Sequence, residues 1–130
     1  MKDIAITENH LYNKAFKNGD KYIGSLVTIH VLPDYTAKKR MLSHPKKLYT
    51  NRIGLSVTKK LGGAVERNRA KRVIRAGLRA VRDEECLKTG KLIVISARNS
   101  ILGKTSEDVR RDLLRGFARL DMLEPRNKES

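Results

Sequence analysis

The chain has 130 residues, the size of one domain, and its 29 Lys and Arg residues outnumber 14 Asp and Glu residues, for a net charge of +15. Leu, Ile, Val and Phe number 34, above the level at which a highly charged chain stays disordered, so we expect a folded basic domain. A single cysteine, Cys86, excludes an internal disulfide and a multi-cysteine zinc site.

The excess of positive charge favours an anionic partner, because self-repulsion within the fold is then relieved. Nucleic acid fits this requirement better than a membrane surface or an acidic protein. The sequence shows neither an apolar run long enough to cross a membrane nor a secretory signal. We therefore expect a cytoplasmic protein.

A short helix is expected over residues 8–17. Side chains that can share one face recur there four residues apart, in the pairs Leu11 with Ala15 and Tyr12 with Phe16. The glycine that follows, Gly19, favours the end of this helix.

Two strands are expected next, separated by a long basic loop. Alternating β-branched residues predict a strand over residues 23–32, and residues 34–47 form the polar, exposed loop. A second strand is expected over residues 52–58. One of its faces carries Ile53, Leu55 and Val57, and the other carries Gly54, Ser56 and Thr58. The second face is small and polar, which leaves room for a ligand to lie flat on it.

The remaining elements are a long helix over residues 64–82, a strand over residues 91–98 and a last helix capped by Thr105 or Ser106. The strand is continuously apolar, which is typical of a strand covered on both faces. The buried stripe of the last helix consists of Val109, Leu113, Phe117 and Leu120. The order of elements predicts a small α/β (α+β) sandwich in a single domain over residues 1–130, with a frayed tail at 125–130.

The helix over residues 64–82 carries the most specific pattern. At about 100° per residue, small and aliphatic side chains fill one arc and basic side chains fill the neighbouring arc, with no acidic residue between them. An ordinary solvated face would mix the signs in i,i+4 pairs, so we expect this face to bind a polyanion. The core arc consists of Ala70, Val73, Ile74, Gly77, Leu78 and Val81, and the basic arc of Arg67, Asn68, Lys71, Arg72, Arg75, Arg79 and Arg82.

Single-stranded RNA is the polyanion that this arrangement favours. The helix lies between two strands and has to pack on the sheet, whereas helices that read a DNA groove usually stand free. We expect it to form one wall of a cleft whose floor is the sheet. Tyr12 and Phe16 are candidates for stacking from the opposite wall, and core packing is an equally good interpretation of both rings.

A nuclease site within the protein is not indicated. Such a site would need paired histidines or carboxylates that cluster around a metal ion. The histidines His10, His30 and His44 fall on separate elements. The run of acids at residues 83–85 points in several directions on a helix, so we interpret it as solvated.

A family resemblance rests on residues 52–75, which read RIGLSVTKKLGGAVERNRAKRVIR. This block, with Arg-Asn-Arg at 67–69 followed by Lys-Arg and a further Arg, resembles the signature of the protein subunit of bacterial ribonuclease P. The segments 12–19, 31–33 and 92–98 and the last helix come in the family's order, so the resemblance covers about residues 8–122.

The resemblance implies a mixed four-stranded sheet with three helices and a left-handed βαβ crossover, against the usual right-handed rule. It implies a subunit of an endoribonuclease holoenzyme that removes the 5′ leader from precursor tRNA. The catalytic RNA subunit would carry the active site and hold Mg²⁺. The protein would bind the leader, broaden substrate use and stabilise the active RNA at low Mg²⁺.

Three groups of RNA-binding residues follow from the resemblance. They are the basic block Arg67, Asn68, Arg69, Lys71, Arg72 and Arg75, the neighbouring Ser56, Lys59 and Lys60, and the leader-cleft residues Tyr12, Phe16 and His30. Three features depart from the family: Ala70 replaces a larger aliphatic residue, His30 replaces an aromatic one, and the loop at 35–48 is longer.

Two other classes of protein remain compatible with the charge and the size. A structural ribosomal protein needs a basic surface but no groove for a leader. A DNA-binding regulator would form a symmetric dimer and read base edges. We expect RNA as the partner, and neither DNA nor a membrane.

Overall fold

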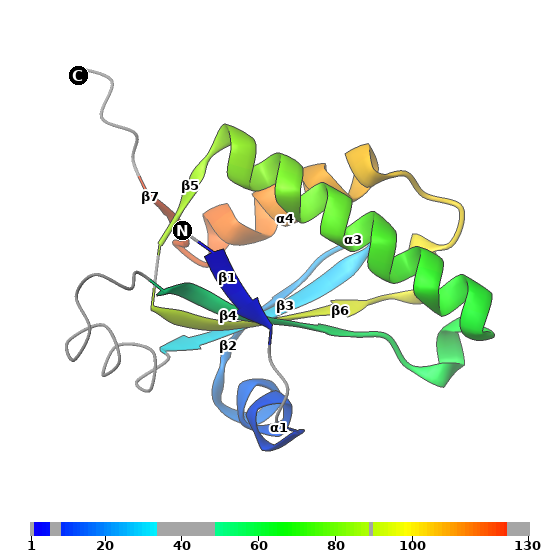
Figure 1. Ribbon diagram of the computed structural model, residues 1–130, viewed down its shortest axis with the longest axis horizontal. Helices are drawn as coiled ribbons and strands as arrows, with labels where there is room; N and C mark the ends of the chain where they lie inside the picture. Colours follow the sequence, from blue (N-terminus) through cyan, green and yellow to red (C-terminus); the bar gives the residue numbers. More distant parts are fainter. Residues whose placement is uncertain (1, 6–8, 34–48, 89, 125–130) are drawn as a thin grey trace.

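The computed structural model describes residues 2–5, 9–33, 49–88 and 90–124, and Figure 1 shows them as a sheet with helices on both faces. The helices are α1 (Asn9–Asn18), α3 (Ala64–Glu84) and α4 (Ser106–Arg119), with short 3₁₀ turns η1 (Lys59–Leu61) and η2 (Asn99–Ile101). The strands are β1 (Lys2–Ala5), β2 (Asp20–Ile23), β3 (Val27–Pro33), β4 (Tyr49–Ser56), β5 (Cys86–Leu87), β6 (Lys91–Ala97) and β7 (Leu123–Glu124).

The main sheet has five strands in the order β1-β4-β6-β3-β2, and β5 and β7 form a separate two-stranded sheet. Strands β4 and β6 are parallel, while β3 is antiparallel to both β6 and β2, so the sheet is mixed. The expected fold class is confirmed, with β1 added in parallel to the outer edge of β4. That edge strand was not predicted, and neither were β5 and β7.

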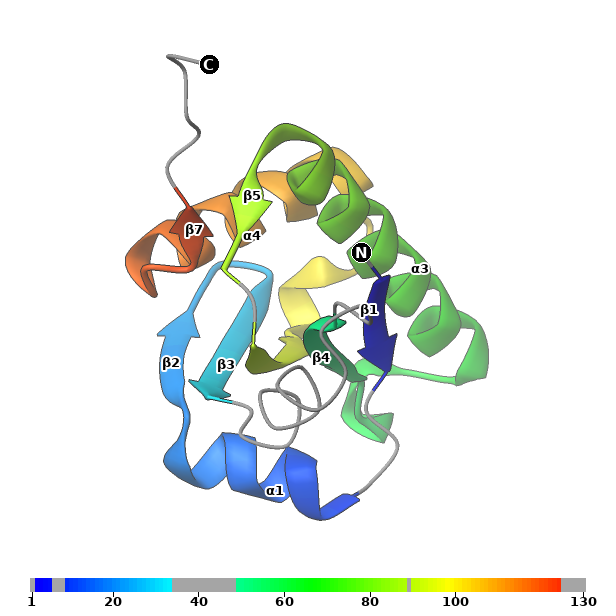
Figure 2. The same ribbon diagram turned by 60° about the vertical axis from the view of Figure 1, so that its left-hand side comes forward.

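Helices α3 and α4 cover one face of the sheet, and α1 covers the other (Figures 1 and 2). The chain leaves β4, returns through α3 and enters β6 beside β4. In both views this crossover is left-handed, as the family resemblance implies.

The strand expected over residues 23–32 is confirmed from Val27 onward as β3, but its predicted start is wrong, because a turn at residues 24–26 separates Ile23, the last residue of β2, from β3. The turn between them is held by Asp112 of α4, whose carboxylate accepts hydrogen bonds from the backbone N–H groups of Leu26 at 2.8 Å and Val27 at 3.0 Å. A Cβ on Gly24 would lie 2.5 Å from this carboxylate, so the turn needs glycine there. A contact 86 residues away in sequence therefore decides where the strand breaks.

Two apolar layers hold the helices to the sheet. On one face, Phe117 and Leu113 of α4 and Ile74 of α3 are fully buried against strand residues such as Ile93. Each such side chain contributes about 1.5–3 kcal/mol by burial. Leu11 and Ala15 of α1 close the smaller layer on the other face, against Leu32, Leu92 and Val94. Strand β6 is thus covered on both faces, as its continuous apolar run predicts.

The helix predictions are confirmed, with small shifts at the ends. Helix α4 begins at the expected cap, because Thr105 and Asp108 exchange hydrogen bonds in a capping box. Helix α3 buries five of the six predicted core-arc residues and half-buries Val73. The basic loop 35–48 and the tail 125–130 lie outside the described residues. No helix in the described ranges is long and apolar enough to cross a membrane.

Candidate nucleic-acid interface

The basic arc of α3 faces away from the core and forms a cationic stripe, defined by Arg67, Asn68, Lys71, Arg72, Arg75, Arg79 and Arg82. Arg67 and Lys71 are half-buried, and the other five residues are exposed. The sixth member of the predicted basic block, Arg69, is also exposed and projects about 60° further round the helix. The stripe is therefore continuous along one side of a single helix, as the sequence predicts.

The cations of this stripe lack acidic partners over most of its length. Within the described residues, no ion pair involves Arg67, Lys71, Arg72, Arg75 or Arg79. The one hydrogen bond of the Arg67 side chain goes from Nε to the carbonyl oxygen of Gly63 at 3.4 Å. Like charges at this spacing destabilise an isolated helix, and bound phosphates would remove that cost.

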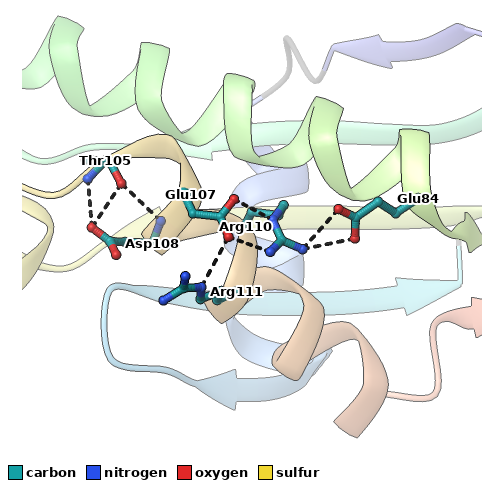
Figure 3. Close-up of polar contacts among 6 residues, drawn as sticks. All are labelled: Glu84, Thr105, Glu107, Asp108, Arg110 and Arg111. Atoms are coloured by element: carbon teal, nitrogen blue, oxygen red, sulfur yellow. Dashed lines mark hydrogen bonds and ion pairs between the residues drawn. The ribbon is translucent and has the colours of Figure 1, made fainter.

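Two acidic residues near the C-terminal end of α3 and at the start of α4, Glu84 and Glu107, pair with arginines of α4 (Figure 3). Glu84, near the end of α3, accepts two hydrogen bonds from Arg110 at 2.9 and 3.1 Å, and Glu107 accepts from Arg110 and Arg111. The hydrogen bond from Arg110 lowers the pKa of Glu107 to about 2. We expected the acidic run at residues 83–85 to be solvated. Glu84 instead pairs with Arg110 and so joins α3 to α4. Among the described residues, His, Cys, Asp and Glu side chains form no group that would hold a metal ion.

The aromatic residues of α1 lie on the other face of the sheet, which we call the α1 face. The ring of Tyr12 covers Gly54 of β4, so that a Cβ on residue 54 would lie 2.6 Å from its Cζ atom. Phe16 meets His30 of β3 edge-on, with ring centroids 5.0 Å apart and an interplanar angle of 86°. Phe16 is 42% exposed, so it is open to a ligand.

His30 supports Phe16 from below and is not itself an open stacking surface. Its side chain is 7% exposed, and its Nδ1 atom has no hydrogen-bond partner in the described structure. Burial lowers the pKa of His30 below its usual value of 6.5, and the neighbouring Lys21 lowers it further. The imidazole is therefore neutral at neutral pH.

The predicted cleft with α3 as one wall and α1 as the opposite wall is wrong. Helices α1 and α3 lie on opposite faces of the sheet, because the crossover from β4 to β6 passes over the face that α1 leaves open (Figure 2). In the part of the chain that the structure describes, the two surfaces approach each other where β4 ends. Ser56 lies on the α1 face there, and the exposed Lys59 and Lys60 of η1 lead into the first turn of α3. The three predicted groups of residues thus form two surfaces joined at one end.

Sequence reasoning missed two residues of the α1 face, Thr28 and Ser96. Both are partly exposed and stand opposite each other on β3 and β6. Alternation along β3 places Thr28 on the same face as His30, which was a usable signal. The continuous apolar run of β6 gives no such signal for Ser96.

Comparison with known proteins identifies the family. The sequence profile described as Ribonuclease P matches residues 1–121. The chain belongs to the ribonuclease P protein family. The ribonuclease P protein component of Bacillus cereus strain Q1 is 46% identical over 71 residues, which are 55% of this chain and 60% of that protein. That of Dehalococcoides mccartyi strain CBDB1 is 39% identical over 93 residues, covering 72% of this chain and 64% of that protein.

Solved ribonuclease P proteins share the fold at low sequence identity. The protein of Staphylococcus aureus superposes with a TM-score of 0.70 at 23% identity, covering 95% of this chain and 100% of that one. The protein of Thermotoga maritima gives a TM-score of 0.60 at 22% identity, covering 80% of this chain and 86% of that one. The ribonuclease P fold therefore extends over most of the chain, whereas the sequence matches span about three fifths of the curated relatives' lengths.

Proposed function

We propose that this chain is the protein subunit of a ribonuclease P ribonucleoprotein that removes the 5′ leader from precursor tRNA. The observation that carries the proposal is the cationic stripe of α3. Within the described residues, no ion pair involves Arg72, Arg75 or Arg79 of this stripe, and Arg72 and Arg75 lie in the sequence block that resembles the family signature. Such a surface matches the spaced negative charges of an RNA backbone.

The two surfaces suggest two RNA contacts. The stripe on α3 binds the catalytic RNA subunit through phosphates. The α1 face binds the single-stranded leader, with the exposed ring of Phe16 and the neighbouring Tyr12 stacking against bases. Ser56, Lys59 and Lys60 lie between them, where the leader meets the RNA subunit.

In this proposal the chemistry belongs to the RNA. The RNA subunit would hold Mg²⁺, which would supply Lewis-acid chemistry for hydrolysis of the phosphodiester bond. The protein's residues bind the leader and orient it relative to that centre. By neutralising phosphates, they also reduce the Mg²⁺ concentration that the active RNA fold requires.

Reconstitution tests the proposed function. The chain is added to a bacterial ribonuclease P RNA and precursor tRNA at low Mg²⁺, and cleavage at the mature 5′ end is measured. We expect cleavage to be restored by the wild-type chain and strongly reduced with Arg72→Glu/Arg75→Glu. The matched control is Arg115→Glu/Arg119→Glu, which reverses two exposed charges on α4. If the wild-type chain restores no cleavage, or both double variants reduce it equally, the proposed function is contradicted.

A further inference from the structure

We propose that three hydroxyl side chains on the α1 face, Thr28, Ser96 and Ser56, form a row that hydrogen-bonds the base edges of single-stranded RNA. This hydroxyl row rests on the proposed function, since the RNA in question is the 5′ leader. It adds two residues, Thr28 and Ser96, to the leader contact.

The register of the sheet places the three residues in line. Thr28 of β3 stands opposite Ser96 of β6 in an antiparallel pair, and Ser96 stands opposite Ser56 of β4 in a parallel pair. Residues opposite each other in neighbouring strands point to the same face, and the strands are about 4.8 Å apart. The hydroxyl row therefore crosses three adjacent strands in the middle of the sheet.

The row lies beside the aromatic residues of α1. Gly54, two residues before Ser56, lies under Tyr12, and His30, two residues after Thr28, contacts Phe16. Gly54 and His30 are both in register with Val94 of β6. The aromatic rings therefore lie over these three residues, which form the row of the sheet beside the hydroxyl row. Two residues along a strand span about 7 Å. A base stacked against these rings would thus extend its polar edge over the hydroxyl row.

The three hydroxyls are free to bind a ligand. All three residues are partly exposed, and within the described part of the chain no hydrogen bond engages their side chains. Two other hydroxyls, by contrast, are engaged: Ser100 Oγ donates to the carbonyl oxygen of Ser25, and Thr105 takes part in its capping box. Serine has no advantage over valine or isoleucine in a central strand, so packing gives no reason for Ser96.

The chemistry of the row fits leaders of many sequences. A hydroxyl both donates and accepts hydrogen bonds, so it can pair with a polar edge of any of the four bases. The row would therefore contribute affinity without demanding one sequence. The exposed Ile23 of β2 stands opposite Thr28 and extends the row with an apolar contact.

The test uses the reconstituted holoenzyme with Thr28→Val, with Ser96→Ala and with both combined. The affinity for precursor tRNA carrying a single-stranded leader is compared with that for tRNA lacking the leader. We expect each single variant to weaken binding of the leader-bearing substrate about 2- to 10-fold, the cost of one lost hydrogen bond, and to leave leaderless tRNA unaffected. Ser106→Ala is the matched control, because it removes an exposed hydroxyl that follows the cap of α4.

A second substrate, with abasic nucleotides in the leader, distinguishes base edges from the sugar-phosphate backbone. We expect the variants and the wild type to bind this substrate equally. Unchanged affinity of the variants for the normal leader overturns the inference, and so does an equal loss on the abasic leader. Both results require a holoenzyme that cleaves, so they are distinct from a failed reconstitution, which contradicts the proposed function and the inference with it.

Discussion

The ring of Tyr12 lies against the backbone of Gly54, with Cζ and Oη both 2.6 Å from the position that a Cβ on residue 54 would take. Any larger residue at position 54 would displace the ring, since real Cβ atoms do not approach so closely. The absence of a side chain in β4 therefore seats the first aromatic residue of α1 on the sheet. The position of the Tyr12 ring on the α1 face depends on this contact, which adds to the packing of Leu11 and Ala15 beneath α1.

We expect Gly54→Ala to destabilise the fold by about 1–3 kcal/mol through overpacking beneath α1. The affinity for leader-bearing substrate should fall as well, because the Tyr12 ring has to move. Denaturant unfolding followed by circular dichroism measures the first effect. Tyr12→Ala in the same chain should recover part of the stability by removing the clash. A single Gly54→Ala variant as stable as the wild type would show that the ring moves without cost.

Salt dependence tests the cationic stripe. If about six phosphates are neutralised, the logarithm of the chain's affinity for the catalytic RNA subunit should fall with log salt at a slope near −4, or about −0.7 per contact. Arg72→Ala should make this slope shallower by about 0.7. Arg119→Ala on α4 removes one exposed charge elsewhere and should leave the slope unchanged. A flat salt response of the wild type would contradict phosphate binding.

The pH dependence of stability follows from His30. Because its pKa in the folded state lies below 6.5, the unfolded chain binds the proton more readily. The neutral imidazole therefore contributes stability above pH 6.5, and this contribution is lost as the pH falls through the lowered folded-state pKa. His30→Phe should remove this part of the acid loss, measured as the thermal midpoint between pH 7.5 and 5. Lys21→Gln should make the acid loss slightly smaller, because it removes the lesser of the two causes and brings the folded-state pKa of His30 closer to that of the unfolded chain.

Asp112 is the polar anchor of the β2–β3 turn. It is 3% exposed and also accepts a hydrogen bond from the hydroxyl of Tyr22 at 2.9 Å. Asp112→Asn keeps the size but turns an amide NH₂ group toward backbone N–H donors, so we expect a loss of about 1–3 kcal/mol in urea unfolding. Tyr22→Phe removes one of the bonds and should cost about 1 kcal/mol. Equal stability of the Asn variant and the wild type would mean that the turn does not depend on this carboxylate.

The periodic spacing of apolar residues along the sequence was enough to predict the helices. The three helices appear where apolar residues recur at helical spacing, and the cap at Thr105 is where the sequence indicates it. The hairpin was missed because Ile23 was joined to the alternating residues 27–32 in one strand, and residues 20–22 were not predicted to be a strand. The turn exists because a carboxylate from α4 satisfies its amides, and strand periodicity does not reveal such a distant partner.

By itself, the sequence determined that one helix has a core side and a cationic side, and that these lie next to each other. A helical repeat of 3.6 residues makes this a property of the segment alone. Only the tertiary structure decided that α1 and α3 lie on opposite faces of the sheet, that His30 is buried beneath Phe16, and that Thr28, Ser96 and Ser56 share a row. Those relationships depend on the hand of the crossover and on strand pairing, which bring together residues far apart in the chain.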